Sequence, residues 1–343
     1  MKIRTARIYD ARTGLANQLF VLIHRILLAR RERADVLILD DFLLEMGCLD
    51  RTCPIEEILD MDHLNRVTYP LVVIGRREAT ALTIEDATYG TDAVRVHVPF
   101  RQSSLAPYFE WNGNLHEIIP DPAPGHQKRL NILYRIGPRL VACSYPEGVN
   151  GRLRDPIQIR LENISFSFIF GWIDSLSREA FDRILSLLQF RPGPLRSPPP
   201  FATVHVLHLR LEEDAILHWA PYNRTSPDEY RDRLTCHYLS IVQRYILPQD
   251  GCVILLSSLT ESPIHECFRE RRYPVFQQEK PATNGREQNA LHDLLYAAQS
   301  CTGTLVANFH PRTLKGSSFS YALVRQCTAA QQIIFVDLDH IPN

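Results

Sequence analysis

The sequence has no long apolar run, no closely paired cysteines and almost no net charge. No apolar stretch reaches the roughly 18 residues that a membrane-spanning helix needs. The 38 basic and 39 acidic side chains leave a formal net charge of −1, so no global field attracts nucleic acid or an anionic membrane. An anion that this protein binds must therefore be held by a local site.

The eight cysteines are scattered, and none stands in the C-x-x-C spacing that structural zinc sites use. Cys48 and Cys53 are close enough in sequence for a disulfide. Cys143, Cys252 and Cys301 lie in or beside apolar runs, where cysteine behaves as a small hydrophobic residue. We therefore favour free thiols and expect no bound metal.

The first ten residues are mixed polar and charged, and the apolar segment that follows contains His24 and Arg25, so no secretory signal is recognised. We expect a cytoplasmic protein without a membrane span, or a protein of the secretory pathway if this is a trimmed chain. The sequons at Asn163 and Asn223 would matter only in a secreted chain.

The chain is long enough for two domains of ordinary size. Residues 3–9 and 36–39 are predicted strands, and the spacing of apolar residues between them predicts a helix from Leu15. Strand, turn, helix and strand is a typical start for a nucleotide-binding α/β domain. Residues 68–170 show only short β-like runs.

Residues 191–200 contain five prolines and a glycine, a composition that neither a helix nor a central strand tolerates. We interpret this segment as a linker between an N-terminal domain, residues 1–190, and a C-terminal domain, residues 201–343. The second half repeats the α/β pattern, with predicted strands at 203–209, 252–256, 304–309 and 333–337. The fold class is therefore α/β, with two Rossmann-like domains facing a central cleft.

Three segments contain candidate binding residues. In the first, Gly14 allows a tight turn before a helix, and Asn17 and Gln18 lie in the first helical turn, whose free N–H groups favour negative charge. A plain turn with capping side chains fits the same residues, and from spacing alone it is the better interpretation.

The second segment starts with His208 and Arg210, which share one face at the end of a predicted strand. Ligands of open α/β sheets bind beyond the carboxyl ends of the strands, and a guanidinium there suits a diphosphate. Glu212 and Asp214 are expected to follow on the same loop. An internal ion pair of Arg210 with either carboxylate is an equally good interpretation.

The third segment places Ser317, Ser318 and Phe319 at the start of a predicted helix after a buried strand. Small hydroxyl residues at a helix N-terminus offer donors to phosphate. An ordinary N-cap, with Phe319 in the core, explains the same pattern more simply.

Taken together, the three segments resemble the fucosyltransferase superfamily, which includes protein O-fucosyltransferases, their plant relatives and α-1,2-fucosyltransferases. The segment from Gly14 to Phe20 resembles the N-terminal G-x-x-N-Q motif, with Ala16 where a second glycine is usual. The segment from His208 to Asp214 resembles the H-x-R strand motif in its plant-type form. The family's C-terminal donor-binding stretch is resembled by Asp293–Tyr296, 304–309 and Ser317–Ser320. Pro54–Leu64 resembles a modest family signature that follows the second strand.

This resemblance implies a two-domain GT-B fold and an inverting, metal-independent transfer of fucose from GDP-fucose to a hydroxyl of a glycan or protein. It implies that Arg210 binds the leaving diphosphate and that Asn17 reaches the phosphates. The remaining donor-site residues would be Gly14, Ala16, His208, Ser317, Ser318 and Phe319. No cofactor is expected, and no D-x-D metal motif stands in a convincing loop. Asp214, and after it Glu212, are the candidate bases.

Two alternatives stay open. Transfer of another deoxysugar, such as rhamnose from UDP-rhamnose, fits because plant rhamnosyltransferases resemble the same H-L-R-x-E-x-D pattern. A non-catalytic glycan-binding module on the same fold belongs to a different class of function. The acceptor, the linkage and the oligomeric state are not encoded in any motif that we recognise.

Overall fold

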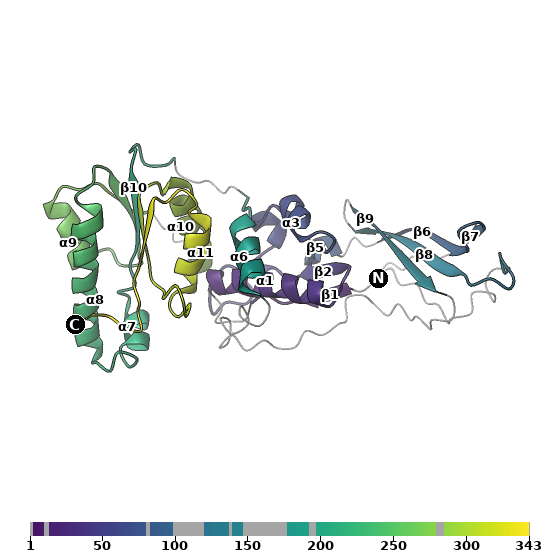
Figure 1. Cartoon of the computed structure of the whole chain (residues 1–343), viewed down its shortest axis with the longest axis horizontal. Coiled ribbons are helices and arrows are strands. Elements are labelled where there is room, and N and C mark those ends of the chain that lie inside the picture. The colour runs from purple at the N-terminus through teal and green to yellow at the C-terminus, as the bar shows by residue number, and fades with distance from the viewer. Residues whose placement is uncertain are drawn as a thin grey trace. The chain divides into compact units, whose positions relative to one another are not determined.

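The structure of the protein is a computed structural model that describes residues 3–9, 14–79, 83–98, 120–136, 139–146, 177–191, 197–278 and 285–342 (Figure 1). The chain forms two compact units, each interrupted in sequence. The first comprises Met1–Ile8, Leu22–Phe42 and Cys53–Ser165, and the second comprises Tyr9–Val21, Leu43–Thr52 and Phe166–Asn343. The predicted boundary at residues 191–200 lies partly outside the described residues, and it stays a prediction.

The first unit contains a parallel sheet of order β1-β2-β5. Its central strand, Val36–Leu39, is buried along its whole length and has the bounds that its apolar run predicts. The helix predicted from Leu15 ends in Arg30 and Arg31, whose charges suit the negative end of the helix dipole. The elements are β1 (Ile3–Ala6), β2 (Val36–Leu39), β5 (Val72–Gly75) and α1 (Leu15–Arg31), which belongs to this unit from Leu22 on and to the second unit before it.

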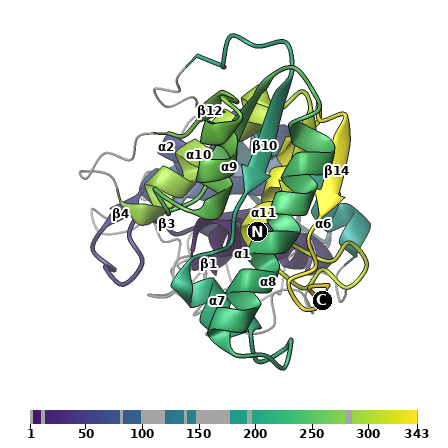
Figure 2. The ribbon, with the colours of Figure 1, turned by 90° about the vertical axis from the view of Figure 1, so that its left-hand side faces the viewer.

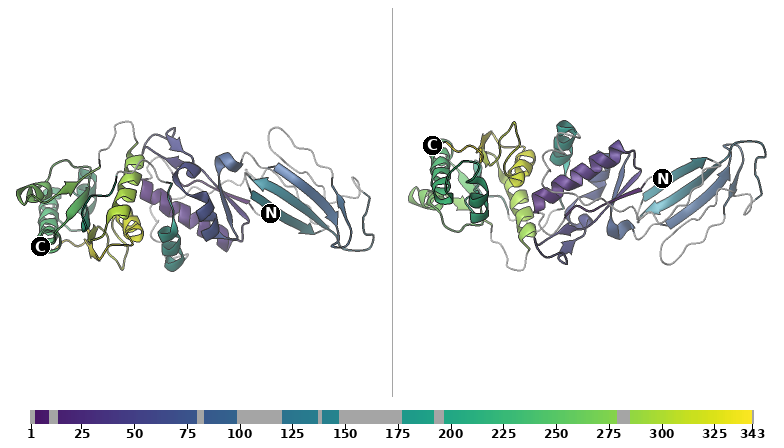
Figure 3. Two further views of the ribbon diagram at one scale, coloured as in Figure 1. Left: turned by 90° about the horizontal axis from the view of Figure 1, so that it is seen from above. Right: turned by 90° about the horizontal axis from the view of Figure 1, so that it is seen from below.

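A second sheet of the first unit is antiparallel, with order β7-β6-β8-β9. The sequence shows only short β-like runs here, because pairing between distant segments, rather than local pattern, defines these strands. Strands β8 and β9 pair along their whole length and lie side by side in Figure 3. The strands are β6 (Thr83–Gly90), β7 (Arg95–His97), β8 (Arg129–Ile136) and β9 (Arg139–Pro146).

The segment Pro54–Leu64, which resembles the modest signature, contains one short helix and the start of a second. Asp60 is the N-cap of the second helix, since its side chain accepts a hydrogen bond from the His63 N–H at 2.8 Å. Ile55 and Ile58 are buried. The remaining short elements are β3 (Phe42–Leu43), β4 (Thr52–Cys53), α2 (Ile55–Ile58), α3 (Met61–Thr68) and α4 (Arg76–Ala79).

The second unit is built on a five-stranded parallel sheet of order β12-β11-β10-β13-β14. Figure 1 shows α8 and α9 on one face of this sheet and α10 and α11 on the other. Its elements are α6 (Arg178–Leu187), β10 (Val204–His208), α7 (Glu213–Trp219), α8 (Pro227–Ile241), a π-helical turn (Val242–Ile246), β11 (Cys252–Leu256), α9 (Pro263–Glu270), β12 (Val275–Phe276), α10 (Arg286–Ser300), β13 (Thr304–Ala307), α11 (Ser318–Gln326) and β14 (Gln332–Phe335).

The described residues therefore confirm the α/β class, with parallel sheets in both units. The central strands β10, β11 and β13 are buried at every position, as expected for a sheet covered on both faces. Ser177 caps α6, as its position predicts. The end of the region with short β-like runs, residues 147–170, and with it the sequon at Asn163, lies outside the described residues.

Candidate functional site

The candidate site lies at the carboxyl ends of β10 and β13. From β10 the chain builds β11 and β12 on one side, then crosses to the other side of β10 for β13 and β14. The order of the strands therefore reverses between β10 and β13. Open α/β sheets bind ligands in the crevice that such a reversal leaves beyond the carboxyl ends of the strands. Arg210 follows β10 and Asn308 follows β13, so both residues stand at this position.

Asn308 is completely buried and connects the ends of the two strands. Its side-chain Nδ2 donates to the carbonyl of His208 at 2.7 Å, and its Oδ1 accepts from the Tyr238 hydroxyl at 2.6 Å. Its backbone N–H donates to the Ser320 hydroxyl at 2.8 Å, and its carbonyl accepts from the Ser317 N–H at 2.7 Å. The side chain and peptide groups of Asn308 thus connect β10, β13, α8 and the start of α11.

Tyr238 completes this network from α8. Its hydroxyl, which donates to Asn308, also accepts the Arg210 backbone N–H at 3.2 Å. The side chain is fully buried, and desolvation raises the pKa of the phenol well above its usual value, so the hydroxyl remains a proton donor at neutral pH.

His208 is nearly buried, and its Nδ1 lies 2.7 Å from the Ser320 hydroxyl. That hydroxyl already accepts the Asn308 N–H, so it keeps every group satisfied by donating its own proton to Nδ1. The ring of His208 also lies 5.0 Å from the ring of Phe319. The structure therefore brings His208 and Phe319 together, with Ser320 as an additional partner of His208.

Arg210 extends from this network toward two carboxylates. Its guanidinium lies 3.8 Å from Glu212 and 3.8 Å from Asp214, and its side chain is 24% exposed. The ion-pair interpretation of the sequence thus describes part of the geometry. Both separations exceed a good hydrogen bond, and the buried Nε of Arg210 has no hydrogen-bond partner among the described residues. The two terminal nitrogens of this partly exposed side chain therefore keep donor capacity for an anion.

The sequence predicted the two carboxylates on a loop, but the structure places them at the start of a helix. Glu212 occupies the N-cap position of α7, and Asp214 lies in its first turn. Acidic residues favour that position because of the helix dipole. The Glu212 Oε1 also approaches the N–H and hydroxyl of Ser258 at 3.4 Å, which links it to the end of β11. Figure 2 shows α7 beyond the end of β10.

Ser317 and Ser318 stand at the start of α11, next to the end of β13. Ser317 is the N-cap: its hydroxyl accepts the Ser320 N–H at 3.3 Å, as the simpler interpretation holds. Ser318 and Phe319 occupy the first helical positions, whose N–H groups have no acceptor within a helix. Gly316 precedes them with φ +133°, and a Cβ there would approach the Asn308 carbonyl to 2.4 Å. The serines are therefore fixed against the end of β13.

The predicted anion site at the start of α1 already contains a carboxylate. The buried Glu287 accepts the Leu15 N–H, and Gly14 faces the same carboxylate. Burial raises the pKa of Glu287. Ala16 is buried, so Gly14 and Ala16 pack against protein here. Helix α1 begins with no acidic residue of its own, and Glu287 supplies the negative charge that its dipole favours.

The polar pair Asn17-Gln18 divides between two environments. Gln18 is buried and exchanges two hydrogen bonds with the backbone of Leu43, at 2.8 and 3.0 Å, so it is structural. Asn17 is partly exposed on the same turn. Phe20, one turn further along α1, packs against Tyr321 of α11 with ring centroids 5.6 Å apart. The start of α1 thus belongs to the same compact unit as the serines.

Sequence reasoning missed Tyr238, Asn308, Ser320 and Glu287. Each lies in an ordinary context: Tyr238 within a helix, Ser320 and Glu287 in the first turn of a helix, and Asn308 after an apolar strand. The only available signal was a buried strand followed by an asparagine, which is a weak one.

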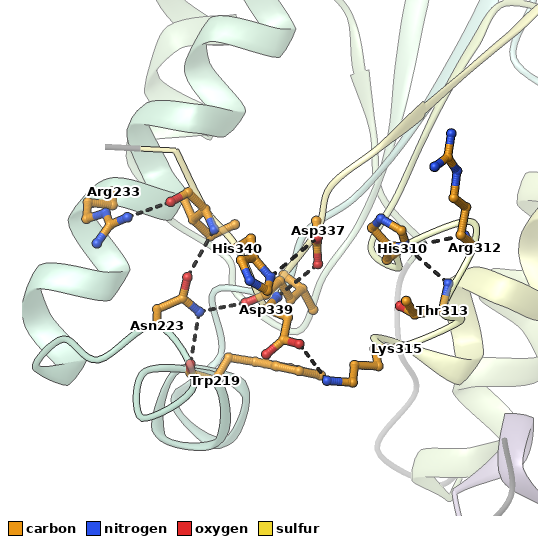
Figure 4. A network of polar contacts seen from close by, with 12 residues as sticks. Trp219, Asn223, Arg233, His310, Arg312, Thr313, Lys315, Asp337, Asp339 and His340 are labelled. Carbon is orange, nitrogen blue, oxygen red and sulfur yellow. Dashed lines mark hydrogen bonds and ion pairs between the residues drawn. The ribbon is translucent and has the colours of Figure 1, made fainter. Parts of the chain in front are cut away.

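A second polar cluster lies at the carboxyl end of β14 and is drawn in Figure 4. It borders a cavity of about 500 Å3 lined in part by Asn223, Arg233 and Asp339. Arg233 donates to the carbonyl of Ile341 at 2.5 Å, and Lys315 pairs with Asp339 at 2.9 Å. Because these polar groups bind one another, we assign the cavity no ligand.

Asn223, the sequon asparagine, is fully engaged in this cluster. Its Nδ2 donates to the carbonyls of Leu338 at 2.8 Å and Trp219 at 3.1 Å, and its Oδ1 accepts the Ile341 N–H at 3.0 Å. The amide that a glycan would occupy therefore holds the end of the chain to the loop after α7.

Within the described part of the chain, no three His, Cys, Asp or Glu side chains are grouped as a metal would require. The described helices include none with the length and apolar character needed to cross a bilayer. No protein-family model matches the chain, and a search of curated proteins found no similar sequence.

Proposed function

We propose that the crevice beyond β10 and β13 binds the diphosphate of a nucleotide sugar and that the protein is a glycosyltransferase. The observation that carries the proposal is the partly exposed Arg210 guanidinium at the strand reversal, whose terminal nitrogens lie 3.8 Å from Glu212 and Asp214, beyond hydrogen-bond distance. Guanidinium donors suit diphosphate oxygens, and the N-terminus of α11 adds a favourable dipole.

The proposed reaction is the transfer of fucose from GDP-fucose to a hydroxyl of a glycan or protein, with inversion and without a metal. The support for fucose is the resemblance of the segments at Gly14, His208 and Ser317 to fucosyltransferases. In this reaction Arg210 would stabilise the charge that develops on the departing diphosphate. The proposal includes the two-domain GT-B fold. One domain of that fold binds the nucleotide on a parallel α/β sheet, and the second unit contains such a sheet.

A panel of calorimetric titrations tests this function. GDP, UDP, GDP-fucose and UDP-rhamnose would each be titrated into the full chain, with Arg210→Gln as the comparison. We expect GDP and GDP-fucose to bind and the variant to bind both more weakly. Preference for the uridine ligands would favour rhamnosyl transfer instead. If the protein binds none of the nucleotides but binds glycans on an array, it is a glycan-binding module and the proposal fails.

A further inference from the structure

The search for further function leads to the buried network behind Arg210. Five hydrogen bonds connect His208, Arg210, Tyr238, Asn308 and Ser320, and donor–acceptor distances run from 2.6 to 3.2 Å. His208, Tyr238, Asn308 and Ser320 are buried, whereas the side chain of Arg210 is 24% exposed. Through Tyr238 and Asn308, the network connects the backbone of Arg210 to the backbone of Ser317. The proposed anion site has the Arg210 guanidinium on one side and the start of α11, which Ser317 caps, on the other.

We propose that Tyr238 and Asn308 are positioning residues that set the Arg210 guanidinium and the N-terminus of α11 at the separation that one diphosphate requires. Tyr238 fixes the Arg210 peptide through its hydroxyl, and Asn308 fixes the Ser317 peptide through its carbonyl. The hydrogen bond between the two side chains, 2.6 Å long, then couples the two walls. This inference rests on the proposed binding of a diphosphate at the crevice.

The geometry favours this role over simple stabilisation of the core. Arg210 lies two residues beyond the end of β10, and its N–H bonds to the Tyr238 hydroxyl instead of a neighbouring strand. If the hydroxyl were absent, two buried groups, the Arg210 N–H and the Asn308 Oδ1, would lose their partners. Such groups move to recover hydrogen bonds. The movement would displace the peptide from which the guanidinium extends.

The same helix supplies a matched control. Tyr230 of α8 is also fully buried, and its hydroxyl donates to the carbonyl of Leu338 at 2.9 Å, outside the network. Tyr230→Phe and Tyr238→Phe each remove one hydroxyl from a buried position on one helix. Tyr238→Phe should lose more thermal stability, because its hydroxyl has two partners and that of Tyr230 has one, but only Tyr238→Phe removes a bond to Arg210.

The experiment measures binding of two probes, inorganic pyrophosphate and GDP, to the full chain by calorimetry. We expect Tyr238→Phe to weaken both by about tenfold, which corresponds to the loss of a typical hydrogen bond. Tyr230→Phe should bind both within twofold of the wild type. In an Arg210→Lys background, Tyr238→Phe should have a smaller effect than alone, because the group that it positions has been replaced.

The outcomes separate this inference from the proposed function. If the wild-type protein binds neither probe, the diphosphate site itself is wrong and both proposals fall. If pyrophosphate binds and GDP does not, the proposed donor is wrong, while the comparison of the two tyrosine variants still decides the inference. If wild type and Tyr238→Phe bind the probes equally, or if Tyr230→Phe weakens binding as much, Tyr238 is a structural residue and the inference is overturned.

Discussion

The Asp214 carboxylate lies 3.8 Å from the Arg210 guanidinium, one helical turn away in sequence, and is itself 63% exposed. Glu212, at the same distance from the other guanidinium nitrogen, is only 16% exposed. The two carboxylates therefore differ in access: Asp214 can meet an acceptor hydroxyl, while Glu212 is better placed to hold Arg210.

This difference predicts separate effects for the two acids. Asp214→Asn should lower kcat strongly and leave the Kd for GDP within about fivefold, because an exposed ion pair contributes roughly 0–1 kcal/mol. Calorimetry beside steady-state kinetics measures both quantities. Glu213→Gln, an exposed neighbour on the same turn, is the control. An unchanged kcat would remove Asp214 from the mechanism.

Replacement of Arg210 should weaken the donor complex without unfolding the protein. A hydrogen bond to a charged group contributes about 1.5–3 kcal/mol, so Arg210→Gln should raise the Kd for GDP roughly 10- to 100-fold. The matched control is Arg231→Gln on α8, where the arginine is exposed and pairs with Asp228. Normal GDP binding by the Arg210 variant would show that this arginine serves only its internal ion pairs.

Turnover and GDP binding should not depend on a divalent cation. The expectation follows from the positive guanidinium and the helix N-terminus, which together supply the charge that a metal would otherwise supply. Activity would be measured after dialysis against EDTA and again after addition of Mn2+ or Mg2+. Loss in EDTA with recovery on adding a metal would contradict the proposed mechanism.

Asn223 should be a stability residue and not a glycan acceptor. Asn223→Ala removes three hydrogen bonds that join the loop after α7 to the segment after β14. We expect a loss of about 1–3 kcal/mol in the free energy of unfolding, measured with urea. Secretion of the chain from a glycosylating host, followed by mass spectrometry of the tryptic peptide, tests the second half. A modified Asn223 in folded protein would be inconsistent with this structure.

Stability should fall in mild acid through His24 of α1. Burial, and after it the charges of Arg25 and Arg31, lower the pKa of His24 to about 4 from its usual 6.5. Between these values the unfolded chain binds more protons than the folded chain, so the contribution of His24 is complete above pH 6.5 and lost as the pH falls toward 4. Urea unfolding of wild type and His24→Gln from pH 7 to pH 4.5 tests this. The variant should show a shallower decline, and parallel curves would exclude His24.

The sequence by itself determined much of the parallel framework. Strands β2 and β11 have the bounds predicted from their apolar runs, and Ser177 caps its helix where predicted. These features depend on a few neighbouring residues, because the bounds of an apolar strand and the cap of a helix are set by residues close together in sequence. The position of Arg210 just beyond a central strand was likewise evident from the pattern.

Only the tertiary structure decided how the site is assembled. Tyr238 and Asn308 are 70 positions apart, and Leu15 and Glu287 are 272 apart, so no local pattern relates the members of either pair. The antiparallel sheet of the first unit likewise depends on pairing between β6 and β8, which are remote in sequence. A buried polar group takes whatever partner the packed chain brings within about 3 Å, and packing brings that partner from a distant segment.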